Sequence, residues 1–199
     1  MLKYIYKFQN INILIVLFFL ISACSLGGKS SPSHFYVLDS KAESVTNEHL
    51  KNLSMAVGPM TIPGYIDRPQ IVTKTKSSEL QLAEFDRWAE PMGDMMIRTL
   101  TGNIKAITGS HLIYSYPWPS RLNYAYQISA KIIKFENDEN GDALLVVHWQ
   151  LRDKKDDSKS KIIHSEFKSN AVDTSYSARV AALNDTLSQF AEKIVKHIN

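Results

Sequence analysis

The sequence predicts an α/β domain of the α+β type, a two-layer sandwich with two amphipathic helices packed on one face of a mostly antiparallel sheet. Three long segments that alternate between apolar and polar residues follow one another over residues 124–168, separated by polar turns. Two other segments, one starting near residue 91 and one near the C-terminus, repeat apolar residues every three or four positions.

The N-terminal part of this domain is expected to consist of short strands. Gly58 and Pro59 are turn residues that end the second strand, and the last strand leads into Trp88. We expect these strands over residues 34–38, 53–57, 70–73 and 79–85.

The first helix is expected to begin near Pro91, because proline is tolerated in a first turn, where its missing N–H needs no partner. Gly109 suits the C-terminal end of the helix. We expect Trp88 to anchor the core where this helix meets the sheet. One apolar stripe follows the helix, formed by Met92, Met96, Leu100, Ile104 and Ile107.

Three long strands are expected over residues 124–132, 143–151 and 161–168. The even positions of the first are apolar, and the odd positions of the second face the core. The polar segments 137–141 and 153–159 join them as turns, which predicts antiparallel pairing.

The last helix has a regular apolar stripe, and Ser175 or Ser177 can cap its first turn. The stripe consists of Val180, Leu183, Leu187, Phe190, Ile194 and Ile198.

The N-terminus has the layout of a bacterial secretory signal. Lys3 and Lys7 precede an apolar run over residues 11–21, which at about 11 residues is short of the ~20 that span a bilayer. Cys24, the only cysteine, closes the tetrapeptide Ile-Ser-Ala-Cys. This tetrapeptide resembles the lipobox of bacterial lipoproteins, which implies S-diacylglycerol and N-acyl groups on Cys24; the alternative is a transmembrane helix followed by a chance cysteine.

These features divide the chain into a signal peptide (residues 1–23), a Gly/Ser/Pro-rich tether (24–33) and a single periplasmic α/β domain (34–199). In enterobacterial sorting, an aspartate after the lipidated cysteine retains a lipoprotein in the inner membrane. The residue in that position is Ser25. We therefore expect the protein to be anchored by its lipid at the periplasmic face of the outer membrane.

Composition and charge exclude several classes of function. The full chain has 23 basic and 20 acidic residues. Lys3 and Lys7 are removed with the signal peptide, so the basic and acidic residues of the mature chain are nearly balanced. A nearly neutral body has no electrostatic basis for binding nucleic acid. With Cys24 lipidated, no thiol remains for a disulfide, a metal site or a nucleophile.

The common catalytic motifs are absent, including His-Glu-x-x-His, Gly-x-Ser-x-Gly and Gly-x-Gly-x-x-Gly. His148 and His164 fall on neighbouring predicted strands and can approach each other, but no third metal ligand has a matching position. Asp86 and Glu90 can share a helix face, which a solvated helix start explains equally well. We therefore predict a protein that is not an enzyme, with no metal site and no cofactor besides the lipid on Cys24.

The segment Tyr-Ser-Tyr-Pro-Trp-Pro over residues 114–119 follows the first helix. Its prolines exclude regular ladder pairing. Exposed tyrosine and tryptophan are favoured at protein and membrane interfaces. The segment therefore either forms an interface or lays its rings over the sheet edge.

Two segments resemble a known family. Residues 57–73 read Val-Gly-Pro-Met-Thr-Ile-Pro-Gly-Tyr-Ile-Asp-Arg-Pro-Gln-Ile-Val-Thr, and residues 82–91 read Leu-Ala-Glu-Phe-Asp-Arg-Trp-Ala-Glu-Pro. Together with the early Phe-Tyr-Val-Leu-Asp at 35–39 and Tyr-Pro-Trp at 116–118, they resemble the ABC-type transport auxiliary lipoproteins, the PqiC/YmbA-like family. The resemblance covers nearly the whole mature chain and departs at Lys74, where arginine is expected more often.

The resemblance implies an outer-membrane lipoprotein that works with an MCE-domain protein of the inner membrane. MCE proteins build hydrophobic conduits for lipids across the periplasm, and the auxiliary lipoprotein is expected to dock the distal end of the conduit. Self-association into a homo-oligomer is left open. Two other functions also stay open: a periplasmic shuttle that carries lipid in its own pocket, and an assembly factor for an outer-membrane complex.

The 57–73 segment suits docking, because its prolines and glycines make it rigid and a rigid loop loses little entropy on binding. The alternative of equal weight is that Asp67 and Arg68 form a local structural contact and the segment closes the core. The predicted partner interface consists of Pro59, Pro63, Tyr65, Asp67, Arg68, Tyr116 and Trp118.

Overall fold

The computed structural model describes residues 31–41, 48–77, 79–156 and 160–198. The chain divides into two units, residues 1–32 and 33–199, and the fold described here is that of the second. Cys24 and nearly all of the predicted signal peptide and tether lie outside the described residues. The elements are β1 (His34–Tyr36), η2 (Glu48–Leu50), β2 (Met55–Thr61), β3 (Gln70–Lys74), β4 (Leu80–Trp88), α2 (Met92–Thr108), β5 (Ile113–Ser115), β6 (Tyr126–Asn137), β7 (Ala143–Asp153), β8 (Lys161–Ser169) and α3 (Tyr176–Lys196).

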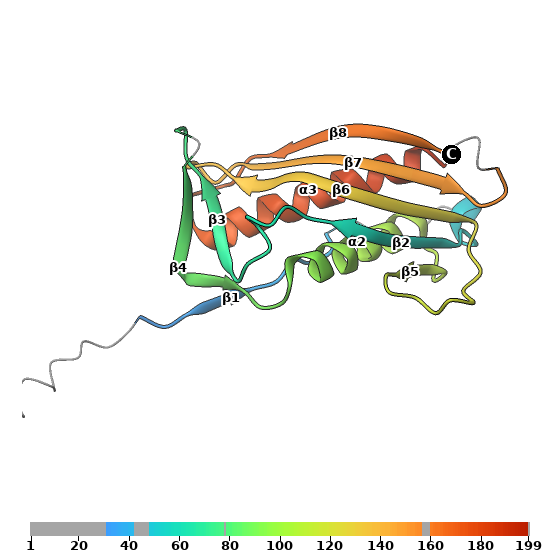
Figure 1. Cartoon of the computed structure of the whole chain (residues 1–199), viewed down its shortest axis with the longest axis horizontal. Coiled ribbons are helices and arrows are strands. Elements are labelled where there is room, and N and C mark those ends of the chain that lie inside the picture. Colours follow the sequence, from blue (N-terminus) through green and yellow to red (C-terminus); the bar gives the residue numbers. More distant parts are fainter. Residues whose placement is uncertain (1–30, 42–47, 78, 157–159, 199) are drawn as a thin grey trace, which may run out of the picture. The chain divides into compact units, whose positions relative to one another are not determined.

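The strands of the described part form one mixed sheet with β6 at its centre (Figure 1). On one side of β6, β7 and then β8 pair antiparallel over their full lengths. On the other side, β2 pairs with the first half of β6, and β3 meets its last residue. β5 extends the sheet beyond β2, whereas β4 and β1 extend it beyond β3. β3 and β4 stand steeply across the end of β6, so the sheet curls (Figure 1).

The prediction of a mostly antiparallel sheet is confirmed only in part, because the sheet is mixed. The pairs β1–β4, β2–β5, β2–β6 and β3–β6 are parallel, and only β3–β4, β6–β7 and β7–β8 are antiparallel. Parallel neighbours need a long crossover between them. Along the chain, β3, β4, α2 and β5 separate β2 from β6. Alternation of apolar and polar residues identifies each strand but not the direction of its partner.

The two predicted helices are confirmed, and they pack on one face of the sheet, where α3 crosses behind β6 and β7 (Figure 1). Strand residues alternate between this face and the helix-free face, so that Leu145, Val147 and Trp149 are buried whereas His148 is exposed. The indole ring of Trp149 packs edge-on against Phe190 of α3, with ring centroids 5.7 Å apart. The core is therefore a single layer between the sheet and the helices.

The helix ends follow the expected chemistry. α2 begins directly after Pro91 and ends at Gly109, which has a φ of 67° and donates its N–H to the carbonyl of Lys105. For α3 the cap is Ser175, whose hydroxyl accepts a hydrogen bond from the N–H of Ala178 at 3.2 Å.

Several predicted boundaries differ from the structure. β2 continues through Gly58 and Pro59 to Thr61, because an irregular register between Val57 and Met60 absorbs the proline. The short strand β5 was not expected, and it stops at Ser115 before the prolines begin. Asp86 belongs to β4 and accepts a hydrogen bond from the Tyr36 hydroxyl, so it shares no helix face with Glu90.

Candidate functional site

The seven residues of the predicted interface lie in three different places. The first place holds Pro59, Tyr116 and Trp118, where β2 passes the segment after β5. The second holds Pro63 and Tyr65, beside the end of β6. The third holds Asp67 and Arg68, beside the start of α2.

The first place contains three rings in edge-to-face contact, which we call the aromatic cluster: Tyr116, Trp118 and Tyr124. The rings of Tyr116 and Trp118 meet edge to face with centroids 5.3 Å apart, and those of Trp118 and Tyr124 with centroids 5.9 Å apart. The ammonium of Lys154 lies 4.5 Å from the centre of the Tyr124 ring, a cation–π contact. Tyr116 is 48% exposed, so the cluster offers an aromatic surface with a cation beside it.

Gly58 lets β2 approach the cluster closely. Its φ of 124° lies in the region that favours glycine, and a Cβ at this position would lie 2.5 Å from the Cβ of Tyr116. The N–H of Tyr116 donates to the carbonyl of Val57 at 2.9 Å, and the peptide bonds before Pro59 and Pro117 are cis. Sequence reasoning gave Tyr116 and Trp118 but missed Tyr124 and Lys154, for which the only available signal was their position beside the predicted strands.

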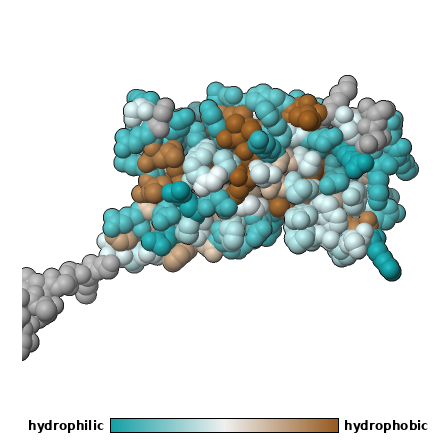
Figure 2. Space-filling model, in the orientation of Figure 1, coloured by the Kyte–Doolittle hydropathy of each residue, from teal (hydrophilic) through white to brown (hydrophobic). Residues whose placement is uncertain are grey.

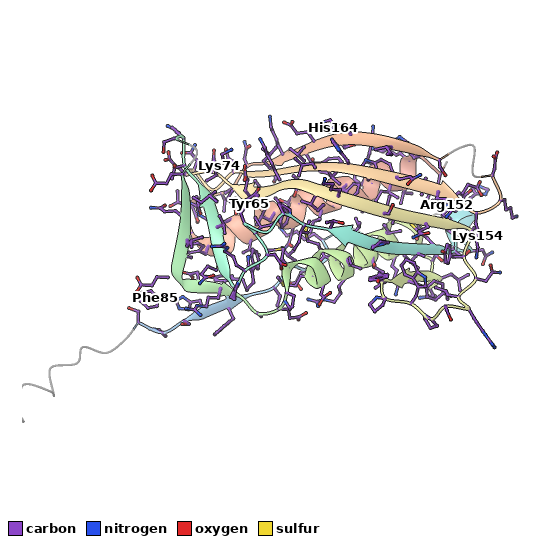
Figure 3. All side chains as sticks on the ribbon, in the orientation of Figure 1. Tyr65, Lys74, Phe85, Arg152, Lys154 and His164 are labelled. Atoms are coloured by element: carbon purple, nitrogen blue, oxygen red, sulfur yellow. The ribbon has the colours of Figure 1, made fainter. Side chains whose placement is uncertain are left out.

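Tyr65 is half-buried and belongs to a contact within the protein rather than to a free surface. Its hydroxyl donates a hydrogen bond of 2.8 Å to Oε2 of Glu136, while Nζ of Lys74 lies 3.6 Å from Oε1 of the same carboxylate. Figure 3 shows Tyr65 and Lys74 reaching the end of β6 from two different segments. Burial raises the pKa of Tyr65 well above its ordinary value, and the hydrogen bond to Glu136 adds to the rise. The backbone carbonyl of Pro63 accepts a hydrogen bond from the N–H of Ile66 in a turn.

Asp67 and Arg68 line a hollow of about 330 Å³ together with the segment that precedes α2. The backbone N–H of Trp88 donates to the carbonyl of Pro69 at 2.7 Å. The two sequence segments that resembled a known family therefore meet at this hollow. Its lining consists of Asp67, Arg68, Pro69, Trp88, Ala89, Glu90, Pro91 and Met92.

Trp88 forms the inner side of this hollow and is buried, as predicted for a core anchor. β1 pairs with β4 here, with Tyr36 opposite Trp88. The hollow therefore lies at the N-terminal end of α2 and the aromatic cluster near its C-terminal end, beside β5 (Figure 1). The 17 residues of α2 separate these ends by roughly 24 Å.

The two strand histidines do approach each other. His148 and His164 are directly opposed on β7 and β8, with ring centroids 5.0 Å apart on the helix-free face. Within the described ranges, no group of three or more histidine, cysteine, aspartate or glutamate residues has the arrangement of a metal site. No helix in the described part of the chain is both long and apolar enough to cross a membrane.

Residues 36–195 match the family model of the ABC-type transport auxiliary lipoprotein component. The chain belongs to this family. The family is one of transport auxiliary lipoproteins and is not a known enzyme family. The matched range includes the hollow at Asp67 and the aromatic cluster.

Solved structures share this fold. A crystal structure of an uncharacterised protein has a TM-score of 0.69 and 17% identity, and the match covers 85% of this chain and 100% of that one. A Xanthomonas campestris protein has a TM-score of 0.64 and 18% identity, over 81% of this chain and 92% of that one. A comparison with curated proteins finds no match.

Proposed function

We propose that the protein is anchored through Cys24 in the outer membrane, where it docks the distal end of a lipid conduit built by an MCE-domain protein. Membership of the transport auxiliary lipoprotein family supports a role beside an ABC-type transport system. The lipobox-like tetrapeptide at Cys24 supports the anchor, and Ser25 supports sorting to the outer membrane. The choice of an MCE-domain protein as the partner rests on the sequence resemblance.

The position of the aromatic cluster carries the docking proposal. A lipid on Cys24 holds β1 within the reach of nine tether residues, at most ~32 Å when fully extended. The aromatic cluster lies beside β5, whose Ser115 contacts Thr101 of α2, and not beside β1. This separation from the anchored strand leaves the cluster open to an incoming partner. Tyrosine and tryptophan are residue types enriched at protein interfaces.

The contrast between Tyr116 and Phe35 tests this proposal. Both are exposed aromatic residues, 48% and 65% respectively, but Phe35 lies on β1 at the tether end. We expect Tyr116→Ala to reduce co-purification of the MCE-domain protein by about tenfold or more, because aromatic anchors dominate interface energies. Phe35→Ala is the matched control and should leave capture unchanged.

Equal capture by both variants would contradict docking at the aromatic cluster. Capture of outer-membrane proteins without any MCE-domain protein would favour the assembly factor instead. The shuttle needs an internal apolar cavity. Within the described residues, a pocket between Trp88, Phe135 and Leu183 measures only about 10 Å³, close to the volume of one water probe.

A further inference from the structure

A second hollow lies on the helix-free face of the sheet, where the β3–β4 hairpin stands across the ends of β6, β7 and β8. Its volume is about 370 Å³, within the range of small-molecule sites. Four lysines line it, and we call it the lysine hollow. They are Lys74, Lys76, Lys134 and Lys168.

Four carboxylates also line the hollow, but each already accepts hydrogen bonds from the protein. Asp138 accepts the backbone N–H groups of Asn140 and Asp142, at 2.9 and 3.0 Å. Asp142 in turn accepts the N–H of Ala171 at 2.9 Å. These bonds hold the β6–β7 turn in shape and direct the acidic groups towards backbone donors.

The remaining two carboxylates are engaged as well. Glu139 accepts the N–H of Lys76 at 3.4 Å. Glu136 is buried and accepts the Tyr65 hydroxyl, with the Lys74 ammonium 3.6 Å away. The acidic side of the hollow therefore stabilises the protein itself.

The lysine ammoniums are less fully used. Lys168 pairs with Glu166 at 2.8 Å, outside the lining of the hollow. In the described residues, neither Lys76 nor Lys134 forms an ion pair, although the Glu166 carboxylate interacts electrostatically with Lys134. Both ammoniums can still approach a ligand in the hollow. Lysine is a common partner of phosphate oxygens, to which it presents a compact charge with three donors. The hollow is thus suited to an anion.

Apolar side chains continue from the hollow along the hairpin. Lys74 is directly opposed to Leu80 and Val72 to Leu82, so the two leucines share the face of the hairpin that carries Lys74. Leu80 is 40% exposed and Leu82 is 45% exposed. Figure 2 shows the corresponding apolar surface over β4, at the left of the view. A hollow that contains two lysines without an ion pair therefore adjoins an exposed apolar strip.

We propose that the lysine hollow binds the phosphate of an anionic glycerophospholipid, whose acyl chains lie over Leu80 and Leu82. The adjoining leucines favour an amphiphile over a soluble phosphate, since burial of apolar surface adds affinity only for a ligand that has chains. This inference rests on the proposed function, which brings lipid to this body. The lysine hollow adds to the docking function a place on the protein surface that can hold a lipid leaving the conduit.

The test uses the full chain in phosphatidylcholine nanodiscs and a dye-labelled short-chain phosphatidylglycerol, with binding read by fluorescence anisotropy against empty nanodiscs. The variant is Lys76→Gln with Lys134→Gln. Its control is Lys105→Gln with Lys155→Gln, which makes the same charge change at two exposed lysines outside the hollow. We expect the first pair to weaken binding about tenfold or more, because each charge-assisted hydrogen bond is strong, and the control pair to bind as the wild type.

Leu82→Gln separates the chains from the phosphate. It should weaken binding of the lipid several-fold while leaving competition by glycerol phosphate unchanged. Three results would overturn the proposal: unchanged binding by the Lys76 and Lys134 variant, equal competition by short-chain phosphatidylcholine, or displacement by inorganic phosphate as effective as by the lipid, which would make this a soluble phosphate site. Retained capture of the MCE-domain protein in any of these cases would leave the docking proposal standing.

Discussion

Tyr65 joins two parts of the chain that lie 71 residues apart, the loop after β2 and the end of β6. For the segment that contains it, the sequence left open a docking role and a structural role, and the Tyr65 hydroxyl satisfies the buried carboxylate of Glu136. A buried carboxylate without its donors is costly, so this contact fixes the loop on the sheet. The sequence predicted a role for Tyr65 in an interface but could not predict its partner Glu136, because this pairing depends on the curl of the sheet.

Tyr65→Phe tests this contact through pH. Tyrosine in an unfolded chain titrates near pH ~10, whereas burial raises the pKa of Tyr65 in the folded protein. The stability that Tyr65 contributes is therefore complete below about pH 10 and falls at higher pH, by up to ~1.4 kcal/mol per pH unit. We expect Tyr65→Phe to lower the free energy of unfolding at neutral pH by about 1–3 kcal/mol and to reduce its alkaline decline.

Urea unfolding from about pH 8 to about pH 11 measures both effects. The pKa of Tyr36 is also raised, by burial and by Asp86, so the wild type and the variant share that part of the decline. Identical slopes for the two proteins would show that Tyr65 does not hold its proton in the fold.

A substitution at Gly58 tests the close packing of β2 against Tyr116. In Gly58→Ala, the new Cβ meets Tyr116 and the backbone keeps a φ of 124°, so the free energy of unfolding should fall by about 1–3 kcal/mol. Gly64→Ala is the matched control, because nothing lies within 4 Å of its new Cβ, and it should change stability by less than ~0.5 kcal/mol. Chemical denaturation of both variants checks the pair, and equal losses would contradict the close approach of β2 to Tyr116.

At the scale of elements, periodicity predicted β6, β7, β8 and both long helices, because each has enough residues to show its repeat. β5 was missed, since three residues carry no readable alternation. The parallel pairs were missed for a different reason. Whether β2 runs parallel to β6 is decided by the crossover through α2, and local sequence does not record it.

The N-cap of α3 is testable at this scale. Ser175→Ala removes the hydrogen bond to the N–H of Ala178 and should lower the free energy of unfolding by about 1 kcal/mol. Ser175→Asp keeps an acceptor at the positive end of the helix and should retain stability. Thermal or urea unfolding distinguishes them. If the alanine variant were as stable as the aspartate variant, the cap would contribute nothing to α3.

At the scale of the whole molecule, the described body has two ends of different chemistry. The tether end combines β1 with the hollow at Asp67 and Trp88, and the other end carries the aromatic cluster. The seven predicted interface residues include members of both ends, because sequence shows which segments are unusual but not where folding takes them. Separation of these groups narrows the docking proposal to Pro59, Tyr116 and Trp118.

The anchor is predicted to be needed for function but not for folding. Cys24→Ala removes the thiol that accepts the lipid, so we expect the protein to leave the membrane fraction while the domain over residues 34–199 keeps its fold. Fractionation of cells, together with circular dichroism of the purified variant, measures the two properties. Full complementation of a deletion strain by this variant would show that the tether is unnecessary.

Docking at the aromatic cluster is tested most directly by photo-crosslinking in living cells, with a benzophenone amino acid placed at position 116 or at position 35. Both positions are exposed and aromatic, so the probes differ mainly in the end of α2 beside which they lie. The expected result is an adduct with the MCE-domain protein from position 116 and none from position 35. An adduct with that protein from position 35 and none from position 116 would contradict docking at the aromatic cluster.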